Sequence, residues 1–545
     1  MNKKRGLGNV VKVWSVMLCT LLALAACSGN GGNASNSGGK DANPAAGSGP
    51  KGANTNAGGE KGSIKESEPM KISASIYDRG KVAADEGSYE HNRWTKWMDE
   101  QSGVDVEWVP ITRNQEADKF NVLVASGQAP DLISSYDRNL LARFVDQGAV
   151  QPIDDYLDQY STVYKQYLEA HPELKPYVTF NGQIYAVASL RNTRALTTVW
   201  VRQDWLDKLK LKVPTTIEEL IDVARAFRDQ DPDGNGKPDT VPIAGSLAYT
   251  PIIEDLFFAR GWEWFMEDGK LVYGNLLDRY KDVLAFQKQV YDEGLVDKEY
   301  LTDKNFARQQ QLWVTGKAGI YFEYVTMTSF PDFKKNNPDA KVVPIPPVAT
   351  KYGTNGYQEE VPNYLLTVFN QNMKNPEAAF KFLDWMLADG WDDITSGEEG
   401  VHSTNVDGIP VIMDTEKYNK EVAYAAEYRL LHQDKLTAES IAAAAGDDPI
   451  AREFAQIKGD AMKVAEGTKY RKDLPYRPDF KELIDMEAQF MKKRDEIIAS
   501  VVIGGSKHTP EWGAAELLKE WNRLGGEEVN KKAMEWYEKN KANFE

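Results

Sequence analysis

Residues 231–240, DPDGNGKPDT, combine acidic and amide side chains with glycine in a pattern that suits a bound cation. Oxygen donors recur at the first, third, fifth, seventh and ninth positions, and Gly236 occupies the sixth, which is the spacing of a calcium-binding EF-hand loop. The pattern therefore predicts a structural Ca²⁺ site. Its five expected donors are Asp231, Asp233, Asn235, the Lys237 carbonyl and Asp239.

The end of this loop departs from an EF-hand. Position twelve is Pro242, where an EF-hand has a bidentate glutamate, and residues 241–245, VPIAG, have the pattern of a strand rather than of a second helix. This excludes a regulatory EF-hand and leaves a plain turn rich in Asp, Gly and Asn as the alternative. A cation would stabilise the turn, because its carboxylates otherwise repel one another near the negative end of a helix.

The residues before the loop predict that helix. Apolar residues recur at helical spacing over residues 217–227, and the helix is expected to end near Asp229. A capping box at its start has two candidate pairs, Thr215 with Glu218 and Thr216 with Glu219.

Beyond residue 70 the sequence alternates between strand and helix patterns. Residues 71–78 and 104–110 are predicted strands, and residues 91–103 are a predicted helix that closes at Gly103. Residues 118–136 repeat a helix, a turn and a strand. Such alternation indicates an α/β sheet with helices on its faces. The C-terminal part is predicted to be almost wholly helical, in segments 421–431, 479–500, 509–524 and 527–542.

The first 26 residues have the pattern of a secretory signal, with a positively charged start, an apolar stretch and small residues before a cysteine. Leu24 to Cys27, LAAC, matches the lipoprotein signal box, which predicts cleavage before Cys27 and lipidation of its thiol. A single membrane anchor is the alternative, although the apolar run is short and is interrupted by Lys12 and Ser15. Residues 27–69, rich in Gly, Asn and Ser, predict a disordered tether.

The exported chain would be strongly acidic and free of reactive thiols. The net charge of −17 becomes −21 when the four basic residues of the signal are removed, which argues against nucleic acid as a partner. Of the two cysteines, Cys19 lies in the signal and Cys27 would be lipidated, so no disulfide or thiolate metal site is expected. The sequence contains no HExxH, GxSxG or nucleotide-binding Gly-Lys-Ser/Thr motif.

Several segments resemble one family, in order along the chain. They include ASGQAPDLI, NGQIYAVAS, RQDWLDKL followed by PTTIEEL, NPEAAFKFLDWML, GEEGVHS and the terminal EWGAAELLKEWNRLGGEEVNKKAMEWYEK. From about residue 69 to its end the chain resembles the extracellular solute-binding lipoproteins of carbohydrate ABC importers, the family 1 proteins of Gram-positive bacteria called LipO or LplA. The resemblance implies an α/β fold of two lobes, like that of periplasmic binding proteins, with a hinge between the lobes and a helical C-terminal region.

The resemblance also implies how the chain forms the lobes. Crossovers near residues 190–195 and 363–370 divide it into an N-lobe and a C-lobe. The expected N-lobe comprises residues 70–192 plus 366–402, and the expected C-lobe comprises residues 193–365 plus 403–545.

The function implied by the resemblance is capture of an oligosaccharide between two closing lobes and its delivery to ABC permease subunits, with ATP hydrolysis by a separate subunit. The protein would be a monomer on the extracellular face of a Gram-positive membrane, attached through its lipid alone. Two alternatives remain. One is a surface-anchored carbohydrate-active enzyme, either a glycosidase or a lyase, and the other is an adhesin or peptide-binding surface protein.

Sugar sites pair aromatic platforms with fixed polar groups, because sugar rings present apolar faces and many hydroxyls. Tyr136 and Asp137 follow a predicted strand, where ligands of open α/β sheets bind. Arg191, with Arg194 near the crossover, fits either a contact with a hydroxyl or uronate or a hinge salt bridge. Aromatic residues in predicted loops and the resemblance add further candidates, namely Trp262, Trp264, Tyr324, Trp391 and Glu399.

Other tryptophans are expected in the core, because they lie on amphipathic helical patterns. These are Trp94, Trp97, Trp385 and Trp521.

The resemblance bears on the calcium loop as well. Solute-binding proteins similar to the alginate-oligosaccharide binders carry such a loop at this place, with an acidic residue after the ninth position. This chain has Thr240 there. The sixth ligand would then be Asp229 or a water molecule.

Overall fold

The structure is a computed structural model that describes residues 70–544, except 192–196, 247–249, 304, 407, 434–436, 438–439, 442–444, 446–447 and 479. The described residues all belong to one compact unit of the chain. The predicted signal, Cys27 and the tether lie outside the described residues. Within the described part of the chain, no helix is both long and apolar enough to cross a bilayer.

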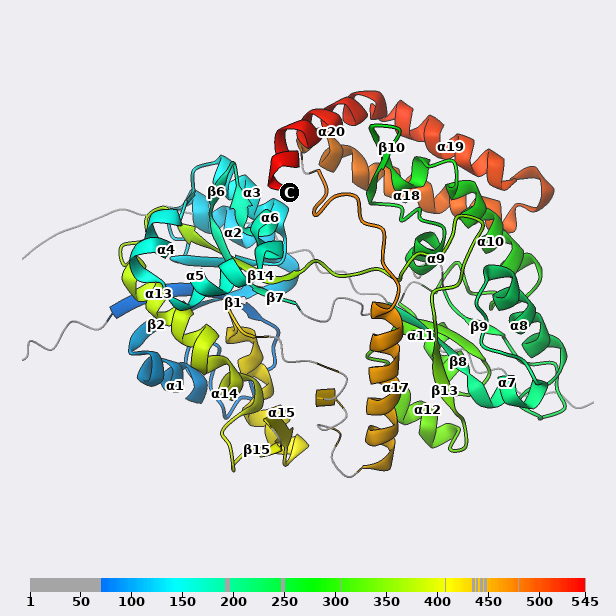
Figure 1. The fold of residues 1–545 in the computed structure, drawn as a ribbon, viewed down its shortest axis with the longest axis horizontal. Coiled ribbons are helices and arrows are strands. Elements are labelled where there is room, and N and C mark those ends of the chain that lie inside the picture. Colours follow the sequence, from blue (N-terminus) through cyan, green and yellow to red (C-terminus); the bar gives the residue numbers. More distant parts are fainter. Residues whose placement is uncertain are drawn as a thin grey trace, which may run out of the picture. The chain divides into compact units, whose positions relative to one another are not determined.

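The first sheet has six strands, in the order β2-β1-β3-β14-β4, with β7 also paired to β14 (Figure 1). Strands β2, β1 and β3 run parallel, as the alternation of strand and helix patterns predicts, whereas β14 runs antiparallel to β3, β4 and β7. Nearly every residue of β14 is buried, as is typical of a strand covered on both faces. The strands are β1 (Met70–Asp78), β2 (Val104–Thr112), β3 (Leu132–Ser135), β4 (Val150–Gln151), β7 (Ala186–Leu190) and β14 (Asn363–Asn370).

Helices pack against the first sheet. The first helix begins after Asn92, whose side chain accepts hydrogen bonds from the next backbone amides, and it ends at Gly103 with a φ of 65°, as the sequence predicts. These elements are α1 (Arg93–Ser102), α2 (Glu116–Ala125), α3 (Arg138–Asp146), α4 (Asp154–Tyr160), α5 (Val163–Ala170), α6 (Lys175–Val178), α13 (Pro376–Trp385) and the hairpin of β5 (Thr179–Phe180) with β6 (Gln183–Ile184).

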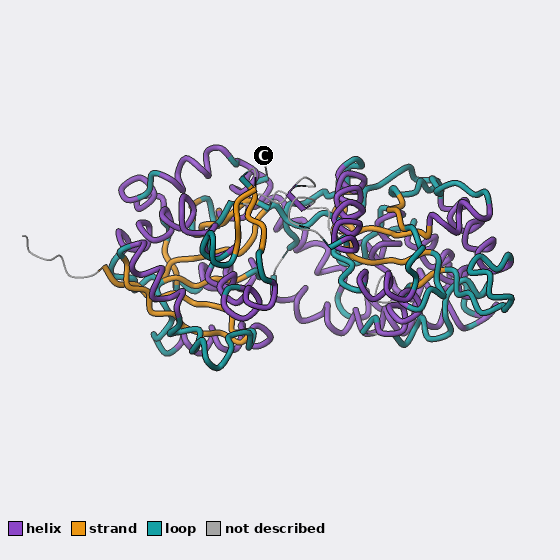
Figure 2. The backbone as a smooth tube through the Cα atoms, turned by 90° about the horizontal axis from the view of Figure 1, so that it is seen from below, coloured by secondary structure: helices purple, strands orange, loops and turns teal. Residues whose placement is uncertain are grey.

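A second sheet has four strands, in the order β13-β8-β12-β9. Strand β8 is buried along its whole length and lies between two antiparallel neighbours. Figure 2 shows helices around the strands of both sheets. The second group comprises β8 (Thr197–Arg202), β9 (Ile243–Ala244), β12 (Ile320–Tyr324), β13 (Val342–Ile345), the hairpin β10 (Trp264–Glu267) with β11 (Lys270–Tyr273), and helices α7 (Gln203–Leu209), α8 (Ile217–Asp229), α9 (Thr250–Leu256), α10 (Tyr280–Asp292), α11 (Ala307–Val314) and α12 (Phe330–Asn336).

Helix α8 confirms the prediction for the residues before the acidic loop. It ends at Asp229, and seven of its apolar residues are buried on one face. Of the two candidate capping pairs, the structure forms the second, because the Thr216 side chain accepts a hydrogen bond from the Glu219 amide at 3.2 Å. The Glu219 carboxylate accepts from the amide of Thr215, one residue before the cap, at 2.8 Å. The strand predicted within 241–245 is β9.

The C-terminal region is helical, as predicted. Helix α17 (Pro449–Glu466) packs on β13, while α18 (Lys481–Ile503) and α19 (Pro510–Arg523) pack against α10, and α20 (Gly526–Asn540) contacts β11. Figure 1 shows α10, α18 and α19 side by side.

The helix predicted over residues 421–431 is replaced by two shorter elements, α15 (Thr415–Glu421) and a 3₁₀ helix over Ala423–Tyr428. A 3₁₀ helix has three residues per turn, so residues three apart lie on one face. Val422, Ala425 and Tyr428 have this spacing and are all fully buried. The remaining elements nearby are α14 (Trp391–Ser396) and the hairpin of β15 (Ser403–Val406) with β16 (Ile409–Ile412).

Each sheet has a buried core that draws on separated segments of the chain. The first core includes residues between Ile72 and Ala188, between Leu365 and Leu431, and Tyr476. The second core runs from Val199 to Tyr357 and continues from Leu474 to Ala533. The chain passes from β7 to β8, returns from β13 to β14, and passes again between residues 431 and 449. The lobe boundaries expected from the sequence stay predictions.

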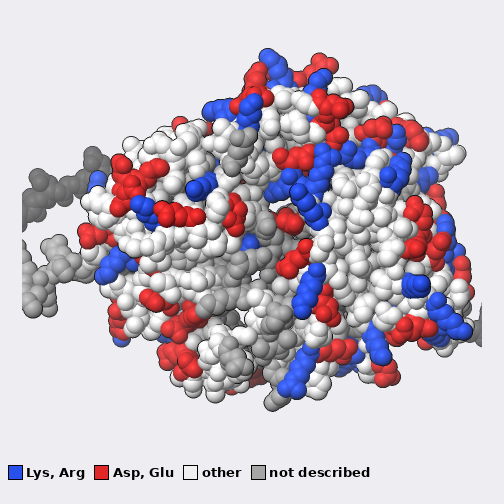
Figure 3. All heavy atoms as spheres, in the orientation of Figure 1, with Lys and Arg blue, Asp and Glu red and all other residues white. Residues whose placement is uncertain are grey.

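The tryptophans expected in the core lie there. Trp94 and Trp521 are fully buried, and Trp97 and Trp385 are partly buried and pack against the first core. On the surface, Lys and Arg side chains are interspersed with Asp and Glu over the face in Figure 3. The negative net charge of the chain is therefore not gathered into one acidic patch on that face.

Candidate ligand-binding site

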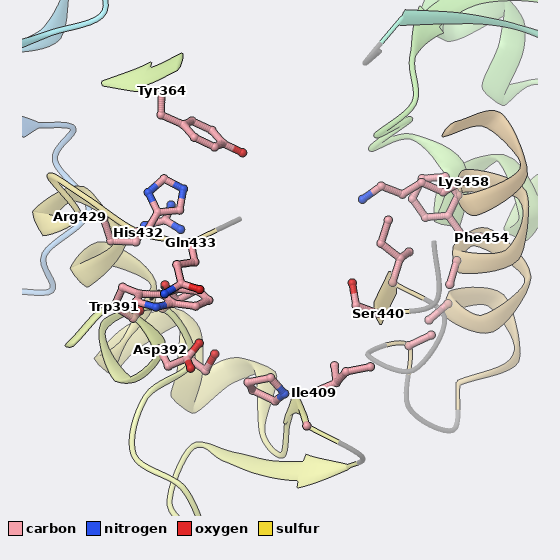
Figure 4. A pocket seen from close by; sticks show the side chains of 18 residues that line it. Tyr364, Trp391, Asp392, Ile409, Arg429, His432, Gln433, Ser440, Phe454 and Lys458 are labelled. Atoms are coloured by element: carbon pink, nitrogen blue, oxygen red, sulfur yellow. Dashed lines mark hydrogen bonds between the residues drawn. The ribbon is translucent and has the colours of Figure 1, made fainter. Parts of the chain in front are cut away.

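A pocket with a volume of about 590 Å³ lies where elements of the first core face helix α17. This volume is within the range typical of small-molecule sites, about 300 to 1,000 Å³. Figure 4 shows side chains pointing into it from both sides. The lining residues with aromatic rings or charges are Tyr364, Trp391, Asp392, Arg429, His432, Phe454 and Lys458.

Three rings form one wall of the pocket. The His432 ring lies 4.5 Å from the Tyr364 ring and 6.4 Å from the Trp391 ring, measured between centroids. Tyr364 is placed by buried strand β14, and Trp391 begins helix α14. Rings of this kind offer the flat faces on which the apolar side of a sugar stacks.

The position of Trp391 depends on an irregular turn of helix. Residues Met386–Gly390 form a π-helical turn between α13 and α14. A Cβ atom at Gly390 would lie 2.6 Å from the Trp385 ring, so this close approach requires glycine. Single π-helical turns are frequent at functional sites.

His432 is held neutral in this wall. Burial, with a smaller contribution from the positive charges of Arg429 and Arg191, lowers its pKa to about 3. Its backbone amide donates to the Ser189 hydroxyl at 2.7 Å, which fixes the residue to strand β7. Its buried Nδ1 has no hydrogen-bond partner among the described residues. The residue therefore presents an uncharged ring to the pocket, while its Nδ1 lies on the buried side.

Helix α17 supplies the opposite wall. Phe454 stacks on Phe330 of α12 with 5.0 Å between ring centroids, so its ring is fixed by the second group of elements. Lys458 lies one turn further along α17, and burial lowers its pKa below the ordinary value. The two walls are thus held by elements that pack on different sheets.

Two of the predicted ligand residues lie at this pocket. Trp391 lines it and is 6% exposed, but it begins a helix rather than lying in the expected loop. Arg191 lies behind the wall, with its guanidinium 4.3 Å from the centre of the Tyr364 ring. Its buried Nε has no hydrogen-bond partner in the part of the chain that the structure describes, and its amide donates to the Pro362 carbonyl. Arg194 lies outside the described residues.

Tyr136 and Asp137 follow strand β3, as expected, but neither lines the pocket. Tyr136 is 43% exposed and stacks on Tyr77 at 5.9 Å, with the Arg113 guanidinium 4.8 Å from its ring. Asp137 caps helix α3, because its carboxylate accepts from the amides of the next turn. Their ligand contacts stay predictions.

The other four predicted ligand residues also lie away from the pocket. Trp264 is 1% exposed and packs between other rings of the second core, so no face of its indole is open to a sugar. Trp262 is partly buried beneath the Arg260 guanidinium. Tyr324 is 48% exposed at the end of β12, and Glu399 is exposed beside β15.

Most of the pocket was missed by sequence reasoning. Arg429 lies within the segment 421–431 that was predicted to be helical, and His432 directly follows that segment. Phe454 and Lys458 lie on an ordinary amphipathic helix. Tyr364 lies in strand β14, a region for which the sequence predicted only a crossover between lobes. No local spacing marks these residues, because segments far apart in sequence bring them together.

The acidic loop has the internal hydrogen bonds expected of a cation-binding turn. The Gly236 amide donates to the Asp231 carboxylate at 3.0 Å, and the Lys237 amide donates to the Asn235 side chain at 2.7 Å. Asp231 Oδ1 and Thr240 Oγ1 are buried without hydrogen-bond partners. These oxygen donors fit Ca²⁺ in kind.

A lysine also enters this loop. The Lys317 ammonium lies 2.7 Å from the Asp239 carboxylate and 3.4 Å from that of Asp233. Among the described residues, no three acidic, histidine or cysteine side chains converge as a group that could hold a metal. The Lys317 ammonium would compete with a cation for the carboxylates of Asp233 and Asp239.

Comparison with known proteins identifies the class. Two α/β sheets formed from interleaved segments, with a ligand-sized pocket between their attached elements, define a solute-binding fold. Residues 81–393 match the family profile of the bacterial extracellular solute-binding proteins, and the chain belongs to this family.

The chain is similar to LipO of Bacillus subtilis, with 30% identity over 225 residues, and to the polygalacturonan/rhamnogalacturonan-binding protein YtcQ of the same organism, with 31% identity over 227 residues. Each alignment covers 40% of this chain and 43% of the relative, so the match spans less than half the length of these curated relatives. The solved structure of the alginate-binding protein AlgQ2 without calcium ion shares the fold, with 20% identity, a TM-score of 0.62, and coverage of 86% of this chain and 98% of AlgQ2.

Proposed function

We propose that this protein is an extracellular solute-binding protein that captures an oligosaccharide in the pocket of Tyr364, Trp391, His432 and Lys458 and delivers it to an ABC permease. The observation that carries the proposal is the composition of this pocket, which combines aromatic rings with a neutral imidazole and basic groups. Aromatic platforms with a few fixed polar groups are what sugar recognition requires. Its membership of the solute-binding family supports the same reading.

Capture would proceed by a shift between open and closed arrangements. Tyr364 and Trp391 belong to the first group of elements, and Phe454 and Lys458 belong to a helix packed on the second sheet. A sugar bound to one wall gains its remaining contacts only when the other wall meets it, so ligand favours the closed arrangement. The permease would recognise that arrangement, and a separate ATPase subunit would power transport.

We do not propose the alternative of a glycosidase or lyase. Most glycosidases use a pair of carboxylates flanking the scissile bond. Asp392 supplies the only carboxylate among the described residues that line the pocket. The pocket is therefore suited to holding a sugar rather than to cleaving it.

We propose the remaining features on the basis of the sequence and the family. The protein would be a monomer, tethered through lipidated Cys27 to the extracellular face of a Gram-positive membrane, without a nucleic-acid partner. LipO, a relative, is named as a lipoprotein, which supports the anchor. We further propose that Asp231, Asp233, Asn235, the Lys237 carbonyl and Asp239 bind a structural Ca²⁺, supported by their oxygen donors and by the two unpartnered oxygens of the loop.

A thermal-shift experiment tests the function. The full chain is incubated with a panel of neutral and acidic oligosaccharides, and the products are analysed by chromatography. Binding to the folded state raises Tm, so at least one sugar is expected to raise it with no product formed. Cleavage of the sugar that raises Tm would contradict the proposal.

Two variants locate the effect. Tyr364→Ala removes one aromatic ring of the pocket. It is expected to weaken binding of the sugar that raises Tm about tenfold. Tyr352→Ala removes an exposed tyrosine that does not line the pocket and serves as the matched control. Equal affinity of the two variants would place the sugar elsewhere.

A further inference from the structure

Three basic side chains surround the aromatic wall of the pocket. Arg429 and Lys458 line the pocket directly, and Arg191 lies over the Tyr364 ring that lines it. The two arginines are close enough to His432 for their charges to lower its pKa. Figure 4 shows Arg429 on one side of the pocket and Lys458 on the other.

These positive charges are not neutralised by the described part of the chain. No described carboxylate forms an ion pair with Arg191, Arg429 or Lys458, and the one hydrogen bond of the Arg429 side chain goes to the Ala426 carbonyl. Elsewhere in the structure buried bases are paired, as Arg260 is with Asp255 and Lys334 with Glu453. Among the described residues, the bases of this pocket thus differ from those two pairs.

Unpaired charges in a partly buried site cost free energy, because burial removes their hydration. Burial lowers the Lys458 pKa, and Asp392 is the one carboxylate among the described residues that line the same pocket. A ligand carboxylate would restore the missing partner, and charge-assisted hydrogen bonds to guanidinium are among the strongest polar contacts. His432 stays neutral and so adds no further positive charge to the site.

We propose that the pocket selects an anionic oligosaccharide, one that carries uronic-acid carboxylates, through Arg429 and Lys458 with Arg191 behind the wall. The inference rests on the proposed function and narrows its ligand class. The net charge of −17 would repel a polyanion at long range, but screening limits that effect to about 10 Å in ordinary buffer. Within the pocket, the nearby positive charges of Arg429 and Lys458 therefore determine the preference for an anionic ligand.

Calorimetry with matched sugars tests this inference. The full chain is titrated with trigalacturonic acid, with its fully methyl-esterified form and with a neutral trisaccharide, at low and high NaCl. The acid is expected to bind at least tenfold more tightly than its ester. High salt is expected to weaken binding of the acid more than binding of the ester, because salt screens the attraction between charges.

Three variants assign the effect to the pocket. Lys458→Met and Arg429→Gln keep much of the side-chain volume and are expected to reduce the preference for acid over ester at least fivefold each. Lys463→Met, on the exposed face of the same helix, should leave both affinities unchanged.

Each other outcome has a distinct meaning. Equal or tighter binding of the ester, or binding of the neutral sugar alone, would overturn the inference and leave the proposed function in place. A preference for acid that survives both pocket substitutions would overturn the role of Arg429 and Lys458. Binding of none of the three sugars, with no Tm shift across the wider panel, would overturn the proposed function itself.

Discussion

At the scale of single residues, the pocket is defined by groups whose usual partners are missing. His432 Nδ1 and Arg191 Nε are both buried without a hydrogen bond among the described residues. Buried polar groups are normally paired, since leaving one unpaired costs about 1 to 3 kcal/mol. His432 lines the pocket, and Arg191 lies behind it over the Tyr364 ring.

His432→Gln is expected to change the pH dependence of stability. The pKa of His432 in the folded chain is about 3. Between about pH 3 and pH 6.5 the His432 imidazole therefore binds a proton in the unfolded chain but not in the folded chain. The contribution of neutral His432 to the free energy of unfolding is therefore complete above pH 6.5 and is lost as pH falls towards 3. The loss between pH 7 and pH 5 is about 2 kcal/mol.

Urea denaturation at pH 7 and pH 5 measures this contribution. The decline of the free energy of unfolding should be smaller in His432→Gln than in the wild type, and unchanged in His91→Gln, which alters an exposed histidine. An identical decline in all three proteins would show that His432 titrates normally.

Sequence reasoning succeeded with residues that carry a local pattern. Gly103, Thr216 and the helical tryptophans Trp94 and Trp521 were placed by capping and periodicity, which depend on nearby residues. The polar pocket groups carry no such pattern. Arg429 directly follows a 3₁₀ helix, where the sequence predicted a continuous α-helix.

At the scale of elements, Asp384 of α13 ties together segments more than 200 residues apart. Its carboxylate accepts hydrogen bonds from the Ser161 hydroxyl at 2.8 Å and from the amides of Thr162, Val163 and Tyr164 at 2.9, 3.1 and 3.0 Å. These amides open helix α5, so a carboxylate there also meets the positive end of that helix.

Asp384→Ala is expected to lower the free energy of unfolding by about 2 to 4 kcal/mol, because it leaves several donors without an acceptor. Asp389→Ala, an exposed aspartate in the following turn, is the control. Chemical denaturation of both variants measures the difference, and equal stability of the two would contradict the capping role.

The acidic loop after α8 makes a second prediction for an element. Added Ca²⁺ is expected to raise Tm above that in EDTA, because the ion binds the folded loop. Lys317→Met should enlarge this difference, since the ammonium no longer occupies the carboxylates of Asp233 and Asp239. Lys212→Met, an exposed lysine without a bond to the loop, is the control. The same Tm in Ca²⁺ and EDTA for every variant would remove the calcium proposal.

The elements with strong periodicity were predicted well, and those set by distant packing were not. Helix α8 and strands β1 and β2 lie where their patterns place them. The π-helical turn before Trp391 and the break of the predicted helix over 421–431 depend on contacts within the first core, which no local pattern encodes.

At the scale of the whole molecule, the account requires that ligand draw the two groups of elements together. The pocket takes Tyr364 and Trp391 from one group and Phe454 and Lys458 from the other. A responding oligosaccharide is therefore expected to lower the radius of gyration in small-angle X-ray scattering. Tyr364→Ala at the same sugar concentration should show a smaller change, and an unchanged radius for the saturated wild type would contradict closure.

The central claim is that this pocket holds the sugar intact, and a crystal structure of the saccharide complex tests it most directly. The account predicts an uncleaved sugar with a ring within about 4.5 Å of Trp391 or Tyr364 and a polar group on Arg429 or Lys458. A sugar bound elsewhere, with this pocket free of it, or a cleaved product in its place, would contradict the account.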